Sequence, residues 1–394
     1  MTISERTGRT GFKFGFSYFL FFAIYGISSP YLQIMLRRIG YSPASVGILL
    51  GIFELVGILG PIVLARKADA MGRFNPFLVG SSVIIVMGSF LLVTVKSPLG
   101  TILSLSLLSL GLKTPVPVMD TSILIALERE RAMGRKTTTY GTLRGLGSVG
   151  FVLVTLSLQI IPGFEAQTPA VMAIVMASLA VVFLISLYWL PESGSGQKTE
   201  KKAGLNLAWI DSTFLIGLGV IALGRLAMAS LNSFFSLYLM ESLQWHAIGA
   251  MSALAAIVEI PMMILSWKFM RKKSPMQVIS LASAAIVVRL LIYAIFPSRL
   301  GVIAGQLLHS ICYGLFQPAS IVFVNLKTPP GERTTGMALL LGIGMGLPAF
   351  IGSALGGLVV EAVGYRWLFA IFSLFAVLSL VLYRMHKKAL IEVR

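Results

Sequence analysis

The sequence predicts an all-α membrane protein with twelve transmembrane helices arranged in two pseudo-symmetric six-helix bundles. Of the 394 residues, 56% are hydrophobic and only 12% are charged, against about 25% charged residues in a soluble domain. Apolar segments of about 20 residues, the length that one membrane span requires, recur twelve times. Most of the 32 Lys and Arg residues lie at the termini and in every second loop, the pattern of cytoplasmic loops.

The apolar segments follow one another along the whole chain, with short polar connections. We expect spans at residues 14–36, 44–65, 76–95, 99–126, 142–163, 168–190, 208–240, 246–267, 276–296, 300–326, 335–360 and 367–384. The basic loops predict that both termini are cytoplasmic, and we expect the protein to reside in the cell inner membrane. The net charge of +17 is explained by the basic residues of these loops. It therefore gives no reason to predict a nucleic-acid partner.

A polar stretch at residues 191–207 has the composition of a flexible linker. It divides the chain into an N-terminal bundle, 1–190, and a C-terminal bundle, 208–394. The two halves share short motifs, because Gly-Leu-Lys-Thr-Pro at 111–115 matches Gly-Leu-Phe-Gln-Pro at 314–318. Two parallel repeats of six spans are typical of transporters that bind their substrate between the halves, near the middle of the membrane.

Ionisable side chains inside apolar segments are the strongest functional signal in the sequence. A charge at the centre of a bilayer costs about 3 kcal/mol or more, so such residues pair, become neutral or line a water-filled cavity. We expect opposite charges from both halves to converge on one hydrated pocket. The residues are Glu54, Lys113, Asp120, Arg144, Arg225, Glu259, Arg289 and His309.

A buried carboxylate that meets an arginine in only one conformation gains and loses its proton as the protein moves. Four residues are therefore predicted to couple transport to protons: Glu54, Asp120, Glu259 and Arg289. The sequence contains no metal-ligand cluster, no phosphate-binding loop and no pair of nucleophile and base. We predict neither an enzyme nor a cofactor.

The loop after the second span reads Asp69-Ala-Met-Gly72-Arg73. Asp69, Gly72 and Arg73 are predicted to form a conformational latch on the cytoplasmic side, in which the acid pairs with an arginine or a helix end in one state. The alternative is an ordinary basic turn.

These motifs resemble the major facilitator superfamily over essentially the whole chain. Asp69-x-x-Gly72-Arg73 is similar to the signature of the loop between its second and third spans. Tyr-Gly-x-x-Arg-x-x-Gly at 140–147 resembles the branch that contains lactose permease and phenylpropionate permease. The combination of Glu259, Arg289 and His309 strengthens that match.

The resemblance implies alternating access and proton-coupled uptake. It matches Asp120 and Arg144 to an acid and an arginine that hold the sugar in lactose permease, and Glu259 and His309 to coupling and binding residues. Cys312 stands where lactose permease has its proton-carrying acid, and Phe151 where a tryptophan stacks on galactose.

The predicted function is a secondary active transporter that imports a small polar or anionic organic solute, a sugar or an aromatic or organic carboxylate, as a proton symporter. A proton-coupled drug or metabolite exporter and an uncoupled uniporter are the alternatives. The predicted partners are the solute, protons and the lipid bilayer, and the protein is expected to be a monomer. The predicted substrate-binding residues are Tyr25, Lys113, Asp120, Arg144, Phe151, Arg225, Glu259 and His309.

Overall fold

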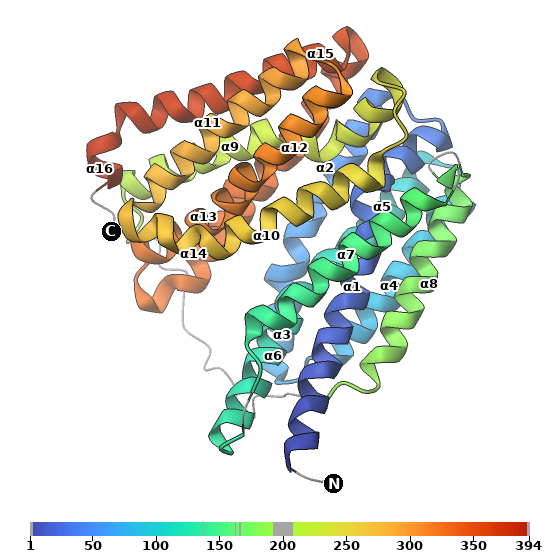
Figure 1. The fold of residues 1–394 in the computed structure, drawn as a ribbon, viewed down its shortest axis with the longest axis vertical. Helices are drawn as coiled ribbons and strands as arrows, with labels where there is room; N and C mark the ends of the chain where they lie inside the picture. The colour runs from blue at the N-terminus through green and yellow to red at the C-terminus, as the bar shows by residue number, and fades with distance from the viewer. Residues whose placement is uncertain (1–2, 136, 162, 165–166, 192–207, 392–394) are drawn as a thin grey trace. The chain divides into compact units, whose positions relative to one another are not determined.

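The computed structural model describes residues 3–135, 137–161, 163–164, 167–191 and 208–391 (Figure 1). Within these ranges the chain is almost entirely helical and contains no strand. The linker predicted at 191–207 lies, apart from Pro191, outside the described residues. Eleven helical stretches of the described chain are long and apolar enough to cross a membrane.

The last of these stretches, Arg333–Met385, has 53 residues, which is long enough for two spans. Gly364 interrupts it with a φ of 83°, a left-handed conformation that favours glycine because this residue lacks a Cβ. The break falls between the spans expected at 335–360 and 367–384. The predicted all-α fold of twelve spans is therefore confirmed.

The helices form two compact units. Unit 1 comprises Met1–Gly40 and Val56–Lys202, and unit 2 comprises Tyr41–Leu55 and Ala203–Arg394. The helix α2 (Pro43–Leu59) is thus divided: its first part packs with the helices of unit 2, although it precedes most of unit 1 in the sequence.

Unit 1 is built around α1, which packs against α7 and α8, while α4 packs against α5 and α8 (Figure 1). Gly147 and Gly150 of α7 let the backbones approach closely, because a Cβ on either would collide with Phe22 or with the Phe19 carbonyl of α1. The elements are α1 (Ile3–Ile39), η1 (Gly60–Ala65), α3 (Arg66–Met71), α4 (Asn75–Thr94), α5 (Pro98–Lys113), α6 (Pro115–Ala132), α7 (Tyr140–Ile160) and α8 (Pro169–Leu187).

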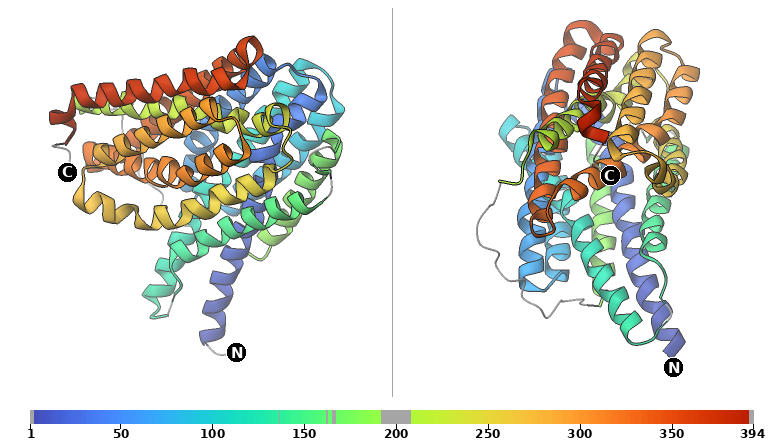
Figure 2. Two further views of the ribbon diagram at one scale, coloured as in Figure 1. Left: turned by 45° about the horizontal axis from the view of Figure 1, so that its top comes forward. Right: turned by 90° about the vertical axis from the view of Figure 1, so that its left-hand side faces the viewer.

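Unit 2 repeats this plan with α9 in the place of α1. In both views of Figure 2, α9, α11 and α15 run side by side, and Gly352 of α15 packs on Ala229 of α9. The elements are α9 (Ser212–Leu237), η3 (Tyr238–Ser242), α10 (Ile248–Lys272), α11 (Pro275–Ile295), α12 (Arg299–Gly314), α13 (Phe316–Lys327), η4 (Pro330–Glu332), α14 (Arg333–Leu339), η5 (Leu340–Gly346), α15 (Leu347–Met385) and α16 (Lys387–Ile391).

The repeated motif marks a helix break in each unit. The fourth span divides into α5 and α6 at Thr114, and the tenth into α12 and α13 at Leu315. Each break lies just before a proline, Pro115 or Pro318, whose missing N–H and bulky ring interrupt a continuous helix. The first break directly follows Lys113, and the second lies six residues after His309, both predicted as functional from the sequence.

Candidate functional site: two polar clusters

The polar cluster of unit 1 is arranged on an aromatic stripe of α1. Tyr18, Phe22 and Tyr25 follow one another at helical spacings, so they share one face of the helix. The rings of Phe22 and Tyr25 are stacked, with centroids 5.6 Å apart. The Tyr25 hydroxyl donates a hydrogen bond of 2.9 Å to the carbonyl of Leu112, close to the break in the fourth span.

Asp120, on α6, is held by tyrosines. The hydroxyl of Tyr18 donates a hydrogen bond to Oδ1 of Asp120. Tyr140, the first residue of α7, reaches the same carboxylate. Tyr18 is fully buried, so its hydroxyl has little access to water and is satisfied by the acid instead.

Arg144 contacts rings of the same aromatic group. Its guanidinium carbon lies 4.2 Å from the centre of the Phe22 ring and 5.6 Å from that of Tyr18. Within the described part of the chain, Arg144 makes no hydrogen bond or ion pair with a carboxylate. Tyr18 therefore lies between the acid and the base, and the two charged groups are brought together without touching.

Two further predicted residues of unit 1 lie at helix crossings. The stem of Lys113 packs over Gly57, where an added Cβ would lie 2.9 Å from the Cγ of Lys113. The carbonyl of Phe151 lies against Gly26 where α1 crosses α7. No described contact gives the Phe151 ring a role.

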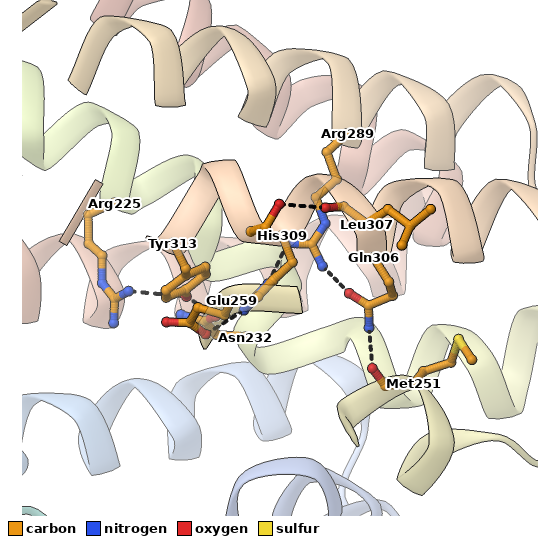
Figure 3. A network of polar contacts seen from close by, with 10 residues as sticks. Arg225, Asn232, Met251, Glu259, Arg289, Gln306, Leu307, His309 and Tyr313 are labelled. Carbon is orange, nitrogen blue, oxygen red and sulfur yellow. Dashed lines mark hydrogen bonds and ion pairs between the residues drawn. The ribbon is translucent and has the colours of Figure 1, made fainter. Parts of the chain in front are cut away.

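The polar cluster of unit 2 is a relay of three residues from three helices (Figure 3). Oε2 of Glu259 on α10 lies 3.2 Å from Nε2 of His309 on α12. The other ring nitrogen of His309, Nδ1, lies 2.9 Å from Nη1 of Arg289 on α11. The side chains of His309 and Glu259 are 16% and 26% exposed, so the relay is partly accessible at its acidic end.

Arg289 itself is buried and well supplied with acceptors. Only 3% of it is exposed. Its Nη2 donates to Oε1 of Gln306, and its Nε donates to the hydroxyl of Tyr293 at 3.4 Å. Gln306 in turn donates to the carbonyl of Met251 at 3.1 Å. Because a buried guanidinium is stable only when its donors are paired, this set holds Arg289 in place.

A second polar group in unit 2 joins α9 to α12. Nη1 of Arg225 donates a hydrogen bond of 3.1 Å to the Tyr313 hydroxyl, which donates to Oδ1 of Asn232 (Figure 3). The ring of Tyr313 stacks on that of His309, with centroids 4.6 Å apart. Glu54, in the part of α2 that packs with unit 2, interacts electrostatically with Arg225.

The residues of the predicted latch lie at the end of α3. Gly72 has a φ of 61° and turns the chain towards α4, and the backbone N–H of Arg73 donates to the Ala68 carbonyl at 3.3 Å. The side chain of Asp69 lies outside the described part of the structure, so the latch stays a prediction.

Several residues of these clusters were not among those predicted from the sequence: Tyr18, Phe22, Tyr140, Asn232, Tyr293, Gln306 and Tyr313. The spacing of 18, 22 and 25 is a signal that one face of α1 is aromatic, although it does not reveal what that face contacts. Among the described residues, no three His, Cys, Asp or Glu side chains form a group that could hold a metal ion.

Comparison with known sequences gives a family match. Residues 12–371 match the MFS_1 like family. The uncharacterized transporter YwbF of Bacillus subtilis (strain 168) is 26% identical over 242 residues, 61% of this chain and 60% of that protein. The probable 3-phenylpropionic acid transporter of Escherichia coli (strain K12) is 22% identical and covers 91% of this chain and 93% of its own length. The maltose permease of Geobacillus stearothermophilus is 24% identical and covers 92% and 90%.

Solved structures share the fold. A crystal structure of a mutant of the nucleoside transporter NupG superposes with a TM-score of 0.82 at 17% identity, covering 95% of this chain and 99% of that one. A bacterial homologue of the human lysosomal transporter Spinster gives a TM-score of 0.70 at 18% identity, covering 98% and 97%.

Proposed function

We propose that this chain, which belongs to the MFS_1 like family, imports a small organic solute together with protons by alternating access. As a member of that family, it is a multi-pass membrane transporter and not an enzyme. The observation that supports proton coupling is the relay from Glu259 through His309 to Arg289. It combines a carboxylate, an imidazole and a buried positive charge within one unit.

The hydrogen-bond directions in the relay link a proton to a movement. An arginine can only donate hydrogen bonds, so Nδ1 of His309 accepts from Arg289. The other nitrogen, Nε2, then carries the hydrogen and donates to Glu259. A second proton on His309 would go to Nδ1, where it would face an N–H of Arg289. Since two donors repel each other, protonation of His309 displaces Arg289 from the imidazole.

The solute is proposed to be a sugar or an organic carboxylate. Among the similar proteins, maltose permease is named after a sugar, and the probable 3-phenylpropionic acid transporter is named after an organic carboxylic acid. The guanidinium group of Arg144 stacks on an aromatic ring, and that of Arg225 is incompletely paired. Both groups support a negatively charged solute in particular. The proposed binding residues are Tyr25, Lys113, Asp120, Arg144 and Phe151 in unit 1 and Arg225, Glu259 and His309 in unit 2. Proton coupling is assigned to Glu54, Asp120, Glu259 and Arg289.

Uptake into proteoliposomes tests the proposal. An inward proton gradient is imposed, and the accumulation of sugars and aromatic carboxylates is measured with and without a proton ionophore. We expect accumulation that the ionophore abolishes. Glu259→Gln should abolish gradient-driven accumulation while weakening solute binding much less, because an amide accepts the His309 hydrogen bond but does not titrate.

Three outcomes would contradict parts of the proposal. Uptake that ignores the ionophore would make the protein a uniporter, and accumulation driven only by an outward proton gradient would make it an exporter. Unchanged transport by Asp120→Asn, Arg144→Ala and Glu259→Gln would remove these residues from the site. A thermal-shift screen of solutes identifies the substrate first, because a bound ligand stabilises the folded protein by mass action.

The remaining features are proposed from the sequence, and the charge pattern supports the orientation among them. Both termini and the linker at 191–207 face the cytoplasm, the protein resides in the cell inner membrane as a monomer, and residues 1–190 and 208–394 form the two bundles. The turn of Asp69, Gly72 and Arg73 then lies on the cytoplasmic side as the latch. Labelling of single cysteines in intact cells tests the orientation, since a cysteine near residue 3 should react only after the membrane is opened.

A further inference from the structure

Arg225 and Asn232 lie seven residues apart on α9, so their side chains point to the same face two turns apart. The hydroxyl of Tyr313, from α12, bridges them: it accepts a hydrogen bond from Arg225 and donates one to Asn232 (Figure 3). This bridge uses the donor of Tyr313 and the carbonyl oxygen of Asn232. The groups left over in the set are N–H donors.

The unpaired donors come from both ends of the bridge. Nε of Arg225 is buried and has no hydrogen-bond partner. In the described part of the chain, the amide nitrogen of Asn232 likewise has no acceptor, and this side chain is exposed although it lies within an apolar span. A buried unsatisfied donor in a native structure requires an explanation, and an absent ligand is one. A ligand that satisfies N–H groups around a guanidinium carries acceptor oxygens and negative charge.

The charged groups around this set are of both signs. Glu54 acts electrostatically on Arg225, and a structural ion pair between these two residues is the simplest alternative role for Arg225. Arg289 and Glu259 both contact His309, whose ring stacks on that of Tyr313. An incoming anion would therefore compete with Glu54 for Arg225.

We propose that Arg225, Tyr313 and Asn232 form the subsite that binds the carboxylate of the transported solute. This inference rests on the proposed transport function and specifies its substrate class as an organic carboxylate. The ring contact between Tyr313 and His309 places the bound carboxylate beside the proton relay, so that solute and proton act on neighbouring side chains of α12.

Matched acids and amides test the subsite. Binding of benzoate, 3-phenylpropionate, lactate and gluconate, and of the corresponding amides, is measured with the purified full-length protein in nanodiscs. For the acids that bind, Arg225→Gln should weaken affinity about 30-fold, because it removes a charged hydrogen-bond donor. The affinity for the amides should change less than about threefold. Arg225→Lys should fall between the wild type and Arg225→Gln, since it retains the charge without the planar group.

Two further variants separate the subsite from a structural ion pair. Glu54→Gln removes the competing carboxylate and should strengthen acid binding about fivefold, the lower end of usual coupling between sites. Tyr313→Phe keeps the stacked ring and removes the bridge, so it should weaken acid binding while lowering the thermal-unfolding midpoint less than Arg225→Gln does. If Glu54→Gln weakened acid binding and lowered the midpoint as much as Arg225→Gln, the ion pair would be structural and the inference would be wrong.

Failure of the inference is distinguishable from failure of the proposed function. If the wild type transports sugars or amides but binds none of the acids, the subsite is refuted and the transport proposal stands. Equal loss of acid and amide binding in Arg225→Gln also refutes the subsite. If accumulation of every solute is insensitive to the ionophore, proton coupling fails, whereas selective loss of acid binding in Arg225→Gln would still support the subsite.

Discussion

Each unit places an aromatic residue between an acid and an arginine, but the two aromatic residues differ in chemistry. In unit 1, Tyr18 donates to Asp120 through its hydroxyl and contacts Arg144 through its ring. In unit 2, His309 contacts Glu259 and Arg289 through its two ring nitrogens. A phenol keeps its proton near neutral pH, whereas an imidazole gains and loses one.

The two arginines differ in the same sense. Arg289 is buried and donates to His309, Gln306 and Tyr293. Arg144 is half-buried and rests on aromatic rings. The two arginines thus differ in how many of their donors the protein itself satisfies, and we propose that the solute binds Arg144 while Arg289 belongs to the proton relay.

Replacing Arg289 should have the largest effect. In Arg289→Gln the relay loses its charge and Gln306 loses its donor, so we expect the free energy of unfolding to fall by about 3 kcal/mol. Gradient-driven accumulation should disappear, while exchange of solute across the membrane, which moves no net proton, should persist. Unfolding in mixed detergent micelles and the two transport assays measure these effects.

The matched control is Arg144→Gln, which removes the same charge from the ring-stacked position. Its free energy of unfolding should stay within about 1 kcal/mol of the wild type, because no described acceptor is left unpaired. Equal destabilisation by the two variants would contradict the difference in hydrogen bonding between Arg289 and Arg144.

Arg144→Lys should have the next largest effect, on solute affinity. The ammonium group retains the charge but cannot lie flat on Phe22 or bind a solute with two parallel hydrogen bonds, so we expect affinity to fall about 10-fold to 30-fold. The thermal-unfolding midpoint should not change. Direct binding of the solute identified by screening provides the measurement, and unchanged affinity would exclude Arg144 from the binding surface.

The different aromatic residues predict different pH profiles. In His309→Gln, an amide carbonyl still accepts from Arg289 and an amide N–H still donates to Glu259, but the position no longer titrates. We expect uptake to lose its dependence on pH between 5 and 8 and to fall about 10-fold at its former optimum. Tyr18→Phe is the control and should retain the pH dependence, because a phenol does not titrate in this range.

The same Tyr18→Phe variant should have a modest effect on stability. Asp120 loses the hydroxyl donor and keeps Tyr140, so we expect the free energy of unfolding to fall by about 1 kcal/mol. Denaturation in mixed micelles measures the change. A loss as large as that of Arg289→Gln would mean that Asp120 depends on Tyr18 alone.

The membrane spans and the charged members of both polar clusters could be predicted from the sequence. Apolar length and the periodic basic loops are properties of each segment, so they can be read without tertiary information. The matching motifs at 111–115 and 314–318 were recognised as a repeat, but the helix break beside each motif became apparent only in the structure. Asp120, Arg144, Glu259, Arg289 and His309 stand out because a polar residue in an apolar helix is conspicuous.

The aromatic members could not be recognised in the same way. Tyr18 and Phe22 are apolar enough to fit any buried or lipid-facing position, so they do not stand out from the other apolar residues of the span. Their role arises where α7 crosses α1 at Gly147 and Gly150, which brings Arg144 onto the Phe22 ring. The division of α2 between the units at Leu55 likewise depends on packing partners distant in the sequence.

The smallest effect is expected where an acid and a base touch directly, without an aromatic residue between them. Nζ of Lys327 lies 2.7 Å from Oδ2 of Asp211, which also caps α9 by accepting a 2.6 Å hydrogen bond from the Phe214 N–H. Burial alone would raise the pKa of Asp211, but the hydrogen bonds from Lys327 and Phe214 outweigh it and lower the pKa.

A lowered pKa means that the folded state favours the ionised carboxylate of Asp211. The ionised carboxylate therefore stabilises the fold at neutral pH. This stabilisation is lost as the pH falls below about 4 and through the lowered pKa. The Asp211 side chain is 51% exposed, and solvent screening keeps the contribution below about 1 kcal/mol. Asp211→Asn preserves the cap and removes the charge. The thermal-unfolding midpoints of wild type and variant should differ slightly at pH 7 and converge as the pH falls through the lowered pKa of Asp211; a gap that widens on acidification would reverse the sign of the interaction.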